Sequence, residues 1–345
     1  MYHKRFSGTH YQAGYRFGSM LKKYGVMIDK SPVFDITEEM KRFSADCMKE
    51  YERYYPEILE EIRGMAEGQG SSFQQLCWIL FCMYCFETEP HCTCFAVADE
   101  ENVILGRNSD FLVSLEELNM NCLYRLDGAY AFNGNTTAFI EMEDGMNEHG
   151  LAIGLTFVYP RIQKPGINAG MLVRYILEKC KTTAEAVERL KELPVASAQT
   201  LAIADSGGKI AVIECNAQAM EILYPEGGKN YVAATNHFHA ECLRQFDPPE
   251  TVDDWRSEDR YKTVKTALET CKGRYSVGVA QRVLAGGYGF ICQYDRKKNA
   301  DTVWSAVYDV KNRKVYRAEG NPSRKRFQED GRMPFAAVLQ KTAEE

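Results

Sequence analysis

Two neighbouring segments of the chain hold the residue types that nucleophilic attack on a carbonyl requires. The first is the run Cys92–Val97 (CTCFAV), and the second, Gly106–Phe111 (GRNSDF), contains Arg107 and Asp110. A thiol attacks a carbonyl as the thiolate, and the ordinary pKa of a cysteine is about 8.5. A cation such as Arg107 would stabilise the thiolate, and a carboxylate such as Asp110 could orient an amine or a substrate nitrogen. The pattern predicts a cysteine nucleophile, although a purely structural ion pair between Arg107 and Asp110 is the alternative.

The two segments are expected to face each other in a β-hairpin. Short apolar runs, Cys92–Ala98 and Val103–Arg107, flank a polar turn of four residues, which is typical of paired strands. Antiparallel pairing would return the second segment to the side of Cys92. Because alternate residues of a strand face the same side, Cys94 points the same way as Cys92, and the local pattern alone leaves both thiols open.

The rest of the sequence predicts an α+β protein. Residues 1–91 are expected to be mainly helical, with apolar residues at three- and four-residue spacing in Thr37–Gly70 and an apolar helix at Leu76–Phe86 that begins with a capping box at Ser72. After residue 91 strands and helices come in separate groups, which favours antiparallel sheets over a doubly wound parallel sheet. The change near residue 91 divides the chain into a helical N-terminal segment, 1–91, and a catalytic region, 92–345, which together form one globular unit.

The elements predicted beyond the first hairpin follow from alternation and helical spacing. Two helices are expected between Val158 and Thr200, and a third at Ser257–Cys271. Further strands are predicted at Leu123–Leu126, Thr137–Met142, Leu151–Val158, Thr200–Ala204, Lys209–Cys215, Met220–Leu223, Tyr231–Thr235, Thr302–Val310 and Lys314–Ala318.

Composition excludes several classes of function. A net charge of −6 argues against a nucleic-acid binder, which would show a basic face. The longest apolar run, Leu76–Phe86, is shorter than the roughly 20 residues of a membrane-spanning helix, and no secretory signal is visible, so a cytoplasmic location is expected. The 12 cysteines are scattered and are expected to be reduced. Their spacing offers no convincing set of zinc ligands, and no cofactor or metal is predicted.

The sequence resembles the N-terminal-nucleophile linear amide hydrolases: choloylglycine hydrolases, penicillin V acylases, acid ceramidase and, above all, the acyl-coenzyme A:6-aminopenicillanate (isopenicillin N) acyltransferase family. Mature chains of that family begin Cys-Thr, and Gly-Arg-Asn-x-Asp follows at about the spacing found here. Further segments resemble the acyltransferase branch along nearly the whole chain: Gly8–Gly14, Gly64–Gly68, Gly145–Leu151, Thr235–Phe238, Trp304–Asp309 and Gly320–Pro322.

The resemblance implies a four-layer αββα sandwich, autoproteolysis before the cysteine, and attack of the thiol on a linear amide. It implies that Cys92 is nucleophile and, through its freed α-amine with a pKa near 8, also general base. Arg107 and Asp110 would orient amine and substrate, Asn236 would donate to the oxyanion, and Arg260 is the matched arginine that follows it. The expected partner is a small N-acyl amide, and residues 1–91 would stay bound after cleavage. A homo-oligomer is left open.

Two departures and two rival schemes accompany this interpretation. His91 precedes the nucleophile where the acyltransferase branch usually has glycine, and Cys94 stands where many relatives have serine or threonine. One rival is a Cys-His hydrolase in which His237 takes the proton of the thiol. The other is a degenerate relative that stays uncleaved and binds acyl ligands without catalysis. Asn236 and Arg260 also have plain alternatives, as a turn-forming asparagine and a surface arginine.

Overall fold

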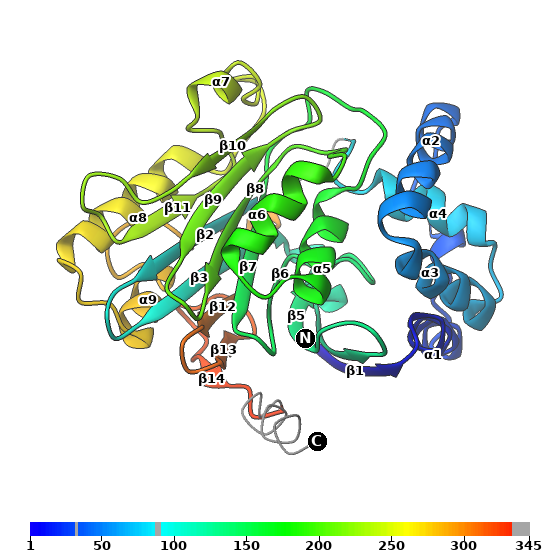
Figure 1. Ribbon diagram of the computed structural model, residues 1–345, viewed down its shortest axis with the longest axis horizontal. Coiled ribbons are helices and arrows are strands. Elements are labelled where there is room, and N and C mark those ends of the chain that lie inside the picture. The colour runs from blue at the N-terminus through cyan, green and yellow to red at the C-terminus, as the bar shows by residue number, and fades with distance from the viewer. Residues whose placement is uncertain (32–33, 87–90, 333–345) are drawn as a thin grey trace.

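Two β-sheets packed face to face form the centre of the protein (Figure 1). The computed structural model describes residues 1–31, 34–86 and 91–332. The first sheet has the strand order β1 (Tyr2–Gly8), β4 (Met120–Leu126), β5 (Phe132–Thr136), β6 (Asp144–Asn147), β7 (Leu151–Phe157), β8 (Gln199–Asp205), β9 (Ile210–Cys215) and β10 (Met220–Leu223). The second has the order β11 (Tyr231–Ala234), β2 (His91–Ala98), β3 (Val103–Leu112), β12 (Ala300–Asp309), β13 (Lys314–Ala318) and β14 (Gln328–Glu329).

Helices cover the outer face of each sheet. The first sheet carries α5 (Ala169–Lys179) and α6 (Thr183–Glu192), and the second carries α8 (Ser257–Thr270) and α9 (Val277–Leu284). Apolar side chains fill the space between the sheets and, separately, the space under each helical layer. Because each sheet buries both faces, the layers follow the order helix, sheet, sheet, helix. The αββα sandwich implied by the family resemblance is confirmed.

The N-terminal segment contributes to the first sheet as well as forming helices. Strand β1 pairs in parallel with β4, whereas the other strand pairs in the described residues are antiparallel. Helices α1 (His10–Lys23), α2 (Glu38–Tyr54), α3 (Pro56–Gln69) and α4 (Phe73–Cys82) pack beside the sandwich, and their apolar faces belong to the same core cluster as α5. The short helix α7 (Glu241–Arg244) lies after β11.

Local sequence explains where the N-terminal helices begin and end. The helical region predicted over Thr37–Gly70 is two helices, because Pro56 occupies the first position of α3, where its missing N–H costs nothing. Gly70 ends α3 with a φ of 74°, which a glycine adopts without strain. Ser72 caps α4 by accepting from the amide of Gln75 at 3.4 Å. This helix ends at Cys82, four residues earlier than the apolar run suggests.

One predicted strand was wrong. Residues Thr137–Met142 form no strand; they connect β5 to β6, and Phe139 has a φ of 59°, which no strand accommodates. Their apolar side chains, including Ile140, pack into the core under the helices and so imitate the alternation of a strand. None of the helices in the described residues has the length and apolar character needed to cross a membrane.

Candidate active site

The β2–β3 hairpin brings the sequence-predicted cysteine and arginine together. In its register Cys94 lies opposite Arg107, Cys92 opposite Ser109, and His91 opposite Asp110. The long side chain of Arg107 reaches diagonally across the hairpin, and its Nη2 donates to Sγ of Cys92 at 2.8 Å. Both side chains are buried between the sheets. The contact that the sequence suggested is therefore present.

Acidic groups on the facing sheet fix the guanidinium of Arg107. Its Nη1 donates to Oδ2 of Asp144 at 2.8 Å, its Nη2 to Oε2 of Glu143 at 3.2 Å, and its Nε to the carbonyl oxygen of Leu155 at 2.8 Å. Burial alone would lower the pKa of Arg107, but the neighbouring anions hold it well above its usual value. The structural ion pair of Arg107 with Asp110, considered as the alternative, is not the arrangement found, because Glu143 and Asp144 pair with Arg107 instead.

The Trp304–Asp309 motif has a structural explanation in the same cluster. Nε1 of Trp304 donates to Asp144 at 3.0 Å, and the hydroxyl of Tyr308 donates to the other oxygen of Asp144 at 2.5 Å. Strand β12 thus holds the carboxylate that holds Arg107. A pair of buried donors on Asp144 keeps the anion in place at the base of the site.

Asn236 and Arg260 form hydrogen bonds with the backbone of Cys92. The amide of Cys92 donates to Oδ1 of Asn236 at 3.1 Å, and Nη1 of Arg260 donates to the carbonyl oxygen of Cys92 at 2.5 Å. Nη2 of Arg260 also donates to Oδ1 of Asn236, at 2.7 Å. Arg260 is fully buried, although it comes from the first turn of α8. Both residues therefore lie at the cysteine, and the surface position considered for Arg260 is wrong.

Asp110, in β3, pairs with His91 at the end of the β2–β3 hairpin that is distant from its turn. It accepts from the hydroxyls of Thr302 at 2.6 Å and Tyr294 at 3.0 Å, and Nη1 of Arg260 is 3.8 Å from its Oδ2. Burial raises the pKa of Asp110 to about 6, and the arginine and the two hydroxyls oppose this rise. Asp110 is thus a carboxyl group whose charge changes within an accessible pH range.

The thiol of Cys92 is protonated in the intact chain. Burial raises its pKa to about 12, and the attraction of Arg107 only partly offsets this. Desolvation disfavours a thiolate more than one neighbouring cation favours it. The Cys92 thiol consequently needs a base, or a change in its solvent exposure, before it can act as a nucleophile.

His91, whose carbonyl precedes Cys92, is buried and stacks on Trp255. The ring centroids are 4.5 Å apart and the planes are inclined by 23°. Burial and the neighbouring Arg260 hold the pKa of His91 well below its usual range, so the imidazole is neutral. The peptide bond between His91 and Cys92 is therefore held on both sides, by this stack and by the contacts of Arg260 and Asn236.

His237 is turned away from the cysteine. Its Nδ1 lies 2.7 Å from Oγ of Ser257, and its Nε2 lies 3.0 Å from a carboxylate oxygen of Glu258. Strand β11 ends at Ala234, one residue before the predicted end, and Asn236 and His237 follow in irregular structure. Their side chains diverge, that of Asn236 toward Cys92 and that of His237 toward helix α8.

Sequence reasoning missed the supporting residues of this site. Glu143 and Asp144 directly precede the Gly145–Leu151 motif, so their neighbourhood gave a signal, but nothing in their spacing points to Arg107. Trp255 and Ser257 flank the start of α8, and their roles depend on how that helix crosses the second sheet. Such contacts between distant segments have no local sequence pattern.

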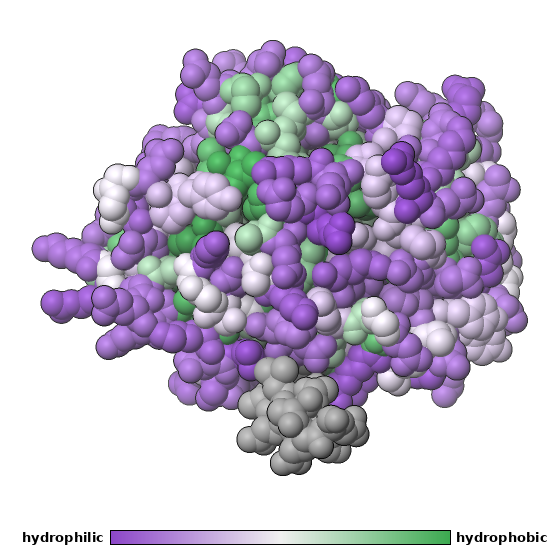
Figure 2. Space-filling model, viewed as in Figure 1, coloured by the Kyte–Doolittle hydropathy of each residue, from purple (hydrophilic) through white to green (hydrophobic). Residues whose placement is uncertain are grey.

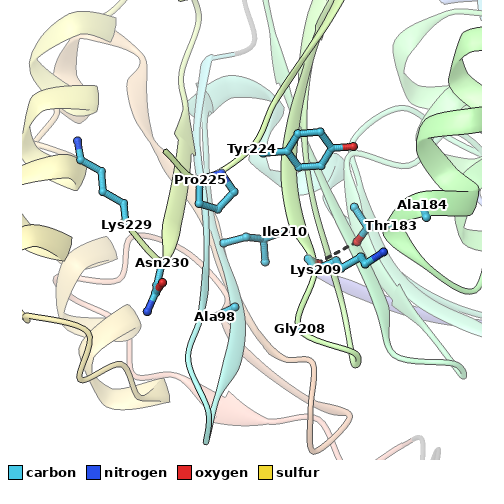
Figure 3. Close-up of a pocket in the computed structure, with 10 residues that line it drawn as sticks. All are labelled: Ala98, Thr183, Ala184, Gly208, Lys209, Ile210, Tyr224, Pro225, Lys229 and Asn230. Carbon is cyan, nitrogen blue, oxygen red and sulfur yellow. Dashed lines mark hydrogen bonds between the residues drawn. The ribbon is translucent and has the colours of Figure 1, made fainter. Parts of the chain in front are cut away.

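A separate hollow of about 440 Å³ lies near the opposite end of β2 (Figure 3). Ala98, at the end of β2 distant from Cys92, lines it, so the hollow is about 20 Å from the thiol at the usual rise per strand residue. Apolar side chains also gather around β9 and β10 in the upper part of the view in Figure 2, while most of that face is hydrophilic. The other residues that line the hollow are Thr183, Ala184, Gly208, Lys209, Ile210, Tyr224, Pro225, Lys229 and Asn230.

The sandwich has counterparts among solved structures. A variant of the conjugated bile acid hydrolase from Clostridium perfringens aligns with a TM-score of 0.50 at 14% identity, covering 69% of this chain and 92% of the other. The penicillin V acylase from Agrobacterium tumefaciens aligns with a TM-score of 0.45 at 16% identity, covering 66% and 82%. At such identities the first of these likenesses supports the fold, and nothing finer.

A family model gives the closer assignment. The model of the acyl-coenzyme A:6-aminopenicillanic acid acyl-transferase family matches residues 97–324. The match includes Arg107, Asp110, Asn236 and Arg260, and it begins five residues after Cys92. Over this range, which is well over half of the sequence, the chain belongs to the acyl-coenzyme A:6-aminopenicillanic acid acyl-transferase family.

Proposed function

We propose that the chain is an autoproteolytic cysteine enzyme that cleaves linear amide bonds of N-acyl compounds, with Cys92 as the nucleophile. Membership of the acyl-transferase family supports the coarser assignment to hydrolases or N-acyltransferases acting on amide bonds. The observation that carries the finer proposal is that a different residue contacts each of three atoms of Cys92: its sulfur, its nitrogen and its carbonyl oxygen. Arg107 contacts its Sγ at 2.8 Å, Asn236 its nitrogen at 3.1 Å and Arg260 its carbonyl oxygen at 2.5 Å.

Autoproteolysis would begin with attack of Sγ of Cys92 on the carbonyl carbon of His91. A carbon–sulfur bond forms, the bond between His91 and the nitrogen of Cys92 breaks, and that nitrogen takes the proton of the thiol. Water then hydrolyses the thioester, which releases the carboxylate of His91 and restores the thiol. The products are residues 1–91 and a chain that begins with Cys92.

The mature site would use the freed amine as its base. The amine takes the proton of the thiol, the thiolate attacks the amide carbonyl of the substrate, and the protonated amine returns its proton to the leaving nitrogen. Asn236 would donate from Nδ2 to the oxyanion, and Asp110 and Arg107 would orient the amine and thiolate. The resulting thioester passes its acyl group either to water or to an acceptor amine, so hydrolysis and transfer share these steps.

The directions of the side chains favour this scheme over the two rivals. In the described residues the contacts of His237 run to Thr235, Ser257 and Glu258 and to neighbouring rings, and none runs to a cysteine. A base must come within hydrogen-bond reach of the proton it takes. A degenerate relative would have no need of separate contacts to the sulfur, the nitrogen and the carbonyl oxygen of one buried cysteine.

The decisive experiment compares intact masses and activities of matched cysteine variants. The parent is expected to appear as fragments of residues 1–91 and 92–345 and to hydrolyse members of an N-acyl amide panel. Cys92→Ala should remain full-length and inert, whereas Cys94→Ala, the same change two residues away, should be cleaved and keep most of the activity. A full-length parent with full activity would contradict autoproteolysis. If Cys94→Ala were inert and Cys92→Ala were cleaved and active, Cys94 would be the nucleophile instead of Cys92.

The choice between amine and imidazole needs a second measurement. Selective acetylation of the α-amine of Cys92 in the cleaved protein removes the basicity of this nitrogen and should abolish turnover although every side chain is intact. Persistent turnover with a fully blocked amine would favour the Cys-His scheme instead.

A further inference from the structure

His237, His239 and Glu258 bring three metal-ligating side chains together beside the proposed active site. One nitrogen or carboxylate oxygen from each lies within 4.8 Å of the other two, and the described part of the chain has no other set of three such residues at this spacing. Nε2 of His237 and Oε2 of Glu258 are 3.0 Å apart. Two imidazoles and one carboxylate form the ligand set of several zinc sites that keep a fourth position for water.

Each of the two histidines has one buried ring nitrogen that lacks a hydrogen bond. Nε2 of His237 and Nε2 of His239 are buried, and neither makes a hydrogen bond. The carboxylate of Glu258 is close to His237, but its direction does not satisfy hydrogen-bond geometry. Buried polar atoms normally make a hydrogen bond, so the unpartnered Nε2 of His239 and the Nε2 of His237, which has only a misdirected carboxylate beside it, point to a ligand that accepts lone pairs.

The other ring nitrogen of each histidine, Nδ1, lies within hydrogen-bond distance of a neighbouring side chain. Nδ1 of His239 lies 3.3 Å from Oε1 of the fully buried Glu214, which as a carboxylate only accepts, so the ring proton is on Nδ1 and the lone pair is on Nε2. Nδ1 of His237 lies 2.7 Å from Oγ of Ser257. Metal-binding histidines almost always have their other nitrogen held by a carboxylate, hydroxyl or carbonyl in this way.

We propose that His237, His239 and Glu258 bind a divalent transition-metal ion of the zinc type, with water in the remaining position. Tetrahedral bonds of about 2.0–2.1 Å place ligand atoms about 3.3 Å apart. Nε2 of His237 and Oε2 of Glu258 already lie this close, whereas the set as a whole spans up to 4.8 Å and has to close around the ion. Glu258 can supply that movement, because its side chain is 56% exposed and its other oxygen is held only by Lys262, at 3.2 Å. The ring of Tyr261 stacks on His239 with centroids 3.8 Å apart and limits the movement of that ligand.

The ion would stiffen the segment that carries the proposed oxyanion donor. Oγ of Ser257 accepts from the backbone amide of Asn236 at 2.8 Å while it also holds the ring of His237. Fixing His237 therefore fixes one end of the Asn236 backbone. The metal has a positioning role in this arrangement, and its binding does not depend on whether Cys92 is a nucleophile.

The test uses the full chain carrying Cys92→Ala and Cys242→Ser, so that the proposed nucleophile and the exposed thiol at Cys242 cannot bind the ion. After treatment with a chelator, zinc is titrated against a chromogenic competitor, and cobalt is added separately. We expect about one zinc per chain, a rise of the unfolding midpoint by a few degrees, and the intense visible bands of four-coordinate cobalt. His237→Ala and His239→Ala should each weaken binding by about a hundredfold or more, and Ser257→Ala by roughly ten- to a hundredfold.

Two further variants keep the result interpretable. Glu258→Gln changes a solvent-exposed residue, should leave the fold intact and should still weaken zinc binding. His3→Ala is the matched control, because His3 also pairs with a glutamate, Glu319 at 2.6 Å, and should leave binding unchanged. Absence of saturable zinc binding up to millimolar concentrations would overturn the proposal and leave His237 and Glu258 as an ion pair. Equal binding by the parent and both histidine variants would overturn it as well.

Discussion

Asn236 joins three groups of the site through one side chain. Its Oδ1 accepts from the amide of Cys92 and from Arg260, and its Nδ2 donates to the carbonyl oxygen of Phe157 at 2.6 Å. An amide held at both ends is oriented before any substrate binds. Preorganisation of this kind is what makes a donor effective toward an oxyanion, since it costs no reorganisation during the reaction.

Asn236→Ala should therefore slow turnover by roughly a hundred- to a thousandfold with a modest change in KM, because one preorganised donor is lost. Steady-state kinetics on the cleaved protein measure this. Asn230→Ala, the same change at an exposed asparagine before β11, is the control and should keep the parental rate. A loss smaller than about fivefold in a folded Asn236→Ala protein would return Asn236 to a structural role.

Asp110 should make stability depend on pH. Its folded pKa of about 6 lies above the ordinary value near 3.9, so between these values the native state holds a proton that the unfolded state has released. The stabilisation from this residue is complete below about pH 4 and is lost as the pH rises through about 6. Two pKa units correspond to about 3 kcal/mol at most.

Urea denaturation of Cys92→Ala with and without Asp110→Asn tests this effect. The uncleaved background keeps unfolding a single-chain process, and the other titrating groups cancel in the comparison. The destabilisation caused by Asp110→Asn should be larger near pH 4 than near pH 7.5, by up to about 3 kcal/mol. Equal destabilisation at both values would mean that Asp110 ionises normally in the folded chain.

At the scale of elements, local pattern predicted the hairpin that carries the nucleophile. Cys92–Ala98 and the first part of β3 are short apolar runs that flank a polar turn, so both strands and their antiparallel pairing follow from nearby residues. Strand β1 had no such signal, because it is an edge strand in which only Phe6 is buried. Its position depends on pairing with β4, more than a hundred residues away in the chain.

The proposed roles of Asn236 and Arg260 could not be derived from local pattern either. Asn236 lies just beyond a strand and Arg260 inside a helix, and each position alone fits an ordinary turn or surface residue. The resemblance to a family supplied both, and the structure then placed both at Cys92. The role of a residue that meets its partners only through tertiary packing cannot be predicted from local sequence.

Helices α1 and α3 approach each other through glycines. A Cβ on Gly14 or Gly18 of α1 would overlap a backbone carbonyl of α3, and a Cβ on Gly64 or Gly68 would overlap one of α1. Both helices therefore lie nearly backbone to backbone, and neither can move away without uncovering the core beneath them. Such an interface admits no added methyl group.

Gly64→Ala should accordingly destabilise the protein by about 2 kcal/mol or more, because the overpacked methyl forces the helices apart. Gly278→Ala in α9 is the matched control: its added Cβ would meet only Oγ of Ser276, at 3.9 Å. That change should be neutral or stabilising by up to about 1 kcal/mol, since alanine is the better helix former. Thermal or urea unfolding measures the change in stability of both variants. Equal changes in the free energy of unfolding would mean that α1 can shift at little cost.

At the scale of the whole molecule, a buried charge cluster joins the N-terminal helices to the sandwich. Arg174 of α5 donates from Nη2 to Glu61 of α3 and from Nε to Glu178, both at 2.7 Å, and all three side chains are buried. Glu178 also accepts from the hydroxyl of Tyr55 at 2.6 Å and lies 3.1 Å from Nε2 of His10. Since β1 additionally extends the first sheet, residues 1–91 are integrated in the fold at two separate places.

We therefore expect the two fragments to stay associated after cleavage and to elute together until denaturant is added. Arg174→Met should separate or unfold them, because it leaves the buried carboxylates of Glu61 and Glu178 without their cation, at a cost of about 3–5 kcal/mol. Lys179→Met removes the neighbouring pair with Glu57, which is partly exposed, and should cost less than about 1 kcal/mol. Size-exclusion chromatography with mass analysis of each peak distinguishes the variants. Co-elution of intact, folded fragments in Arg174→Met would show that β1 and the apolar core hold the fragments together without the charge cluster.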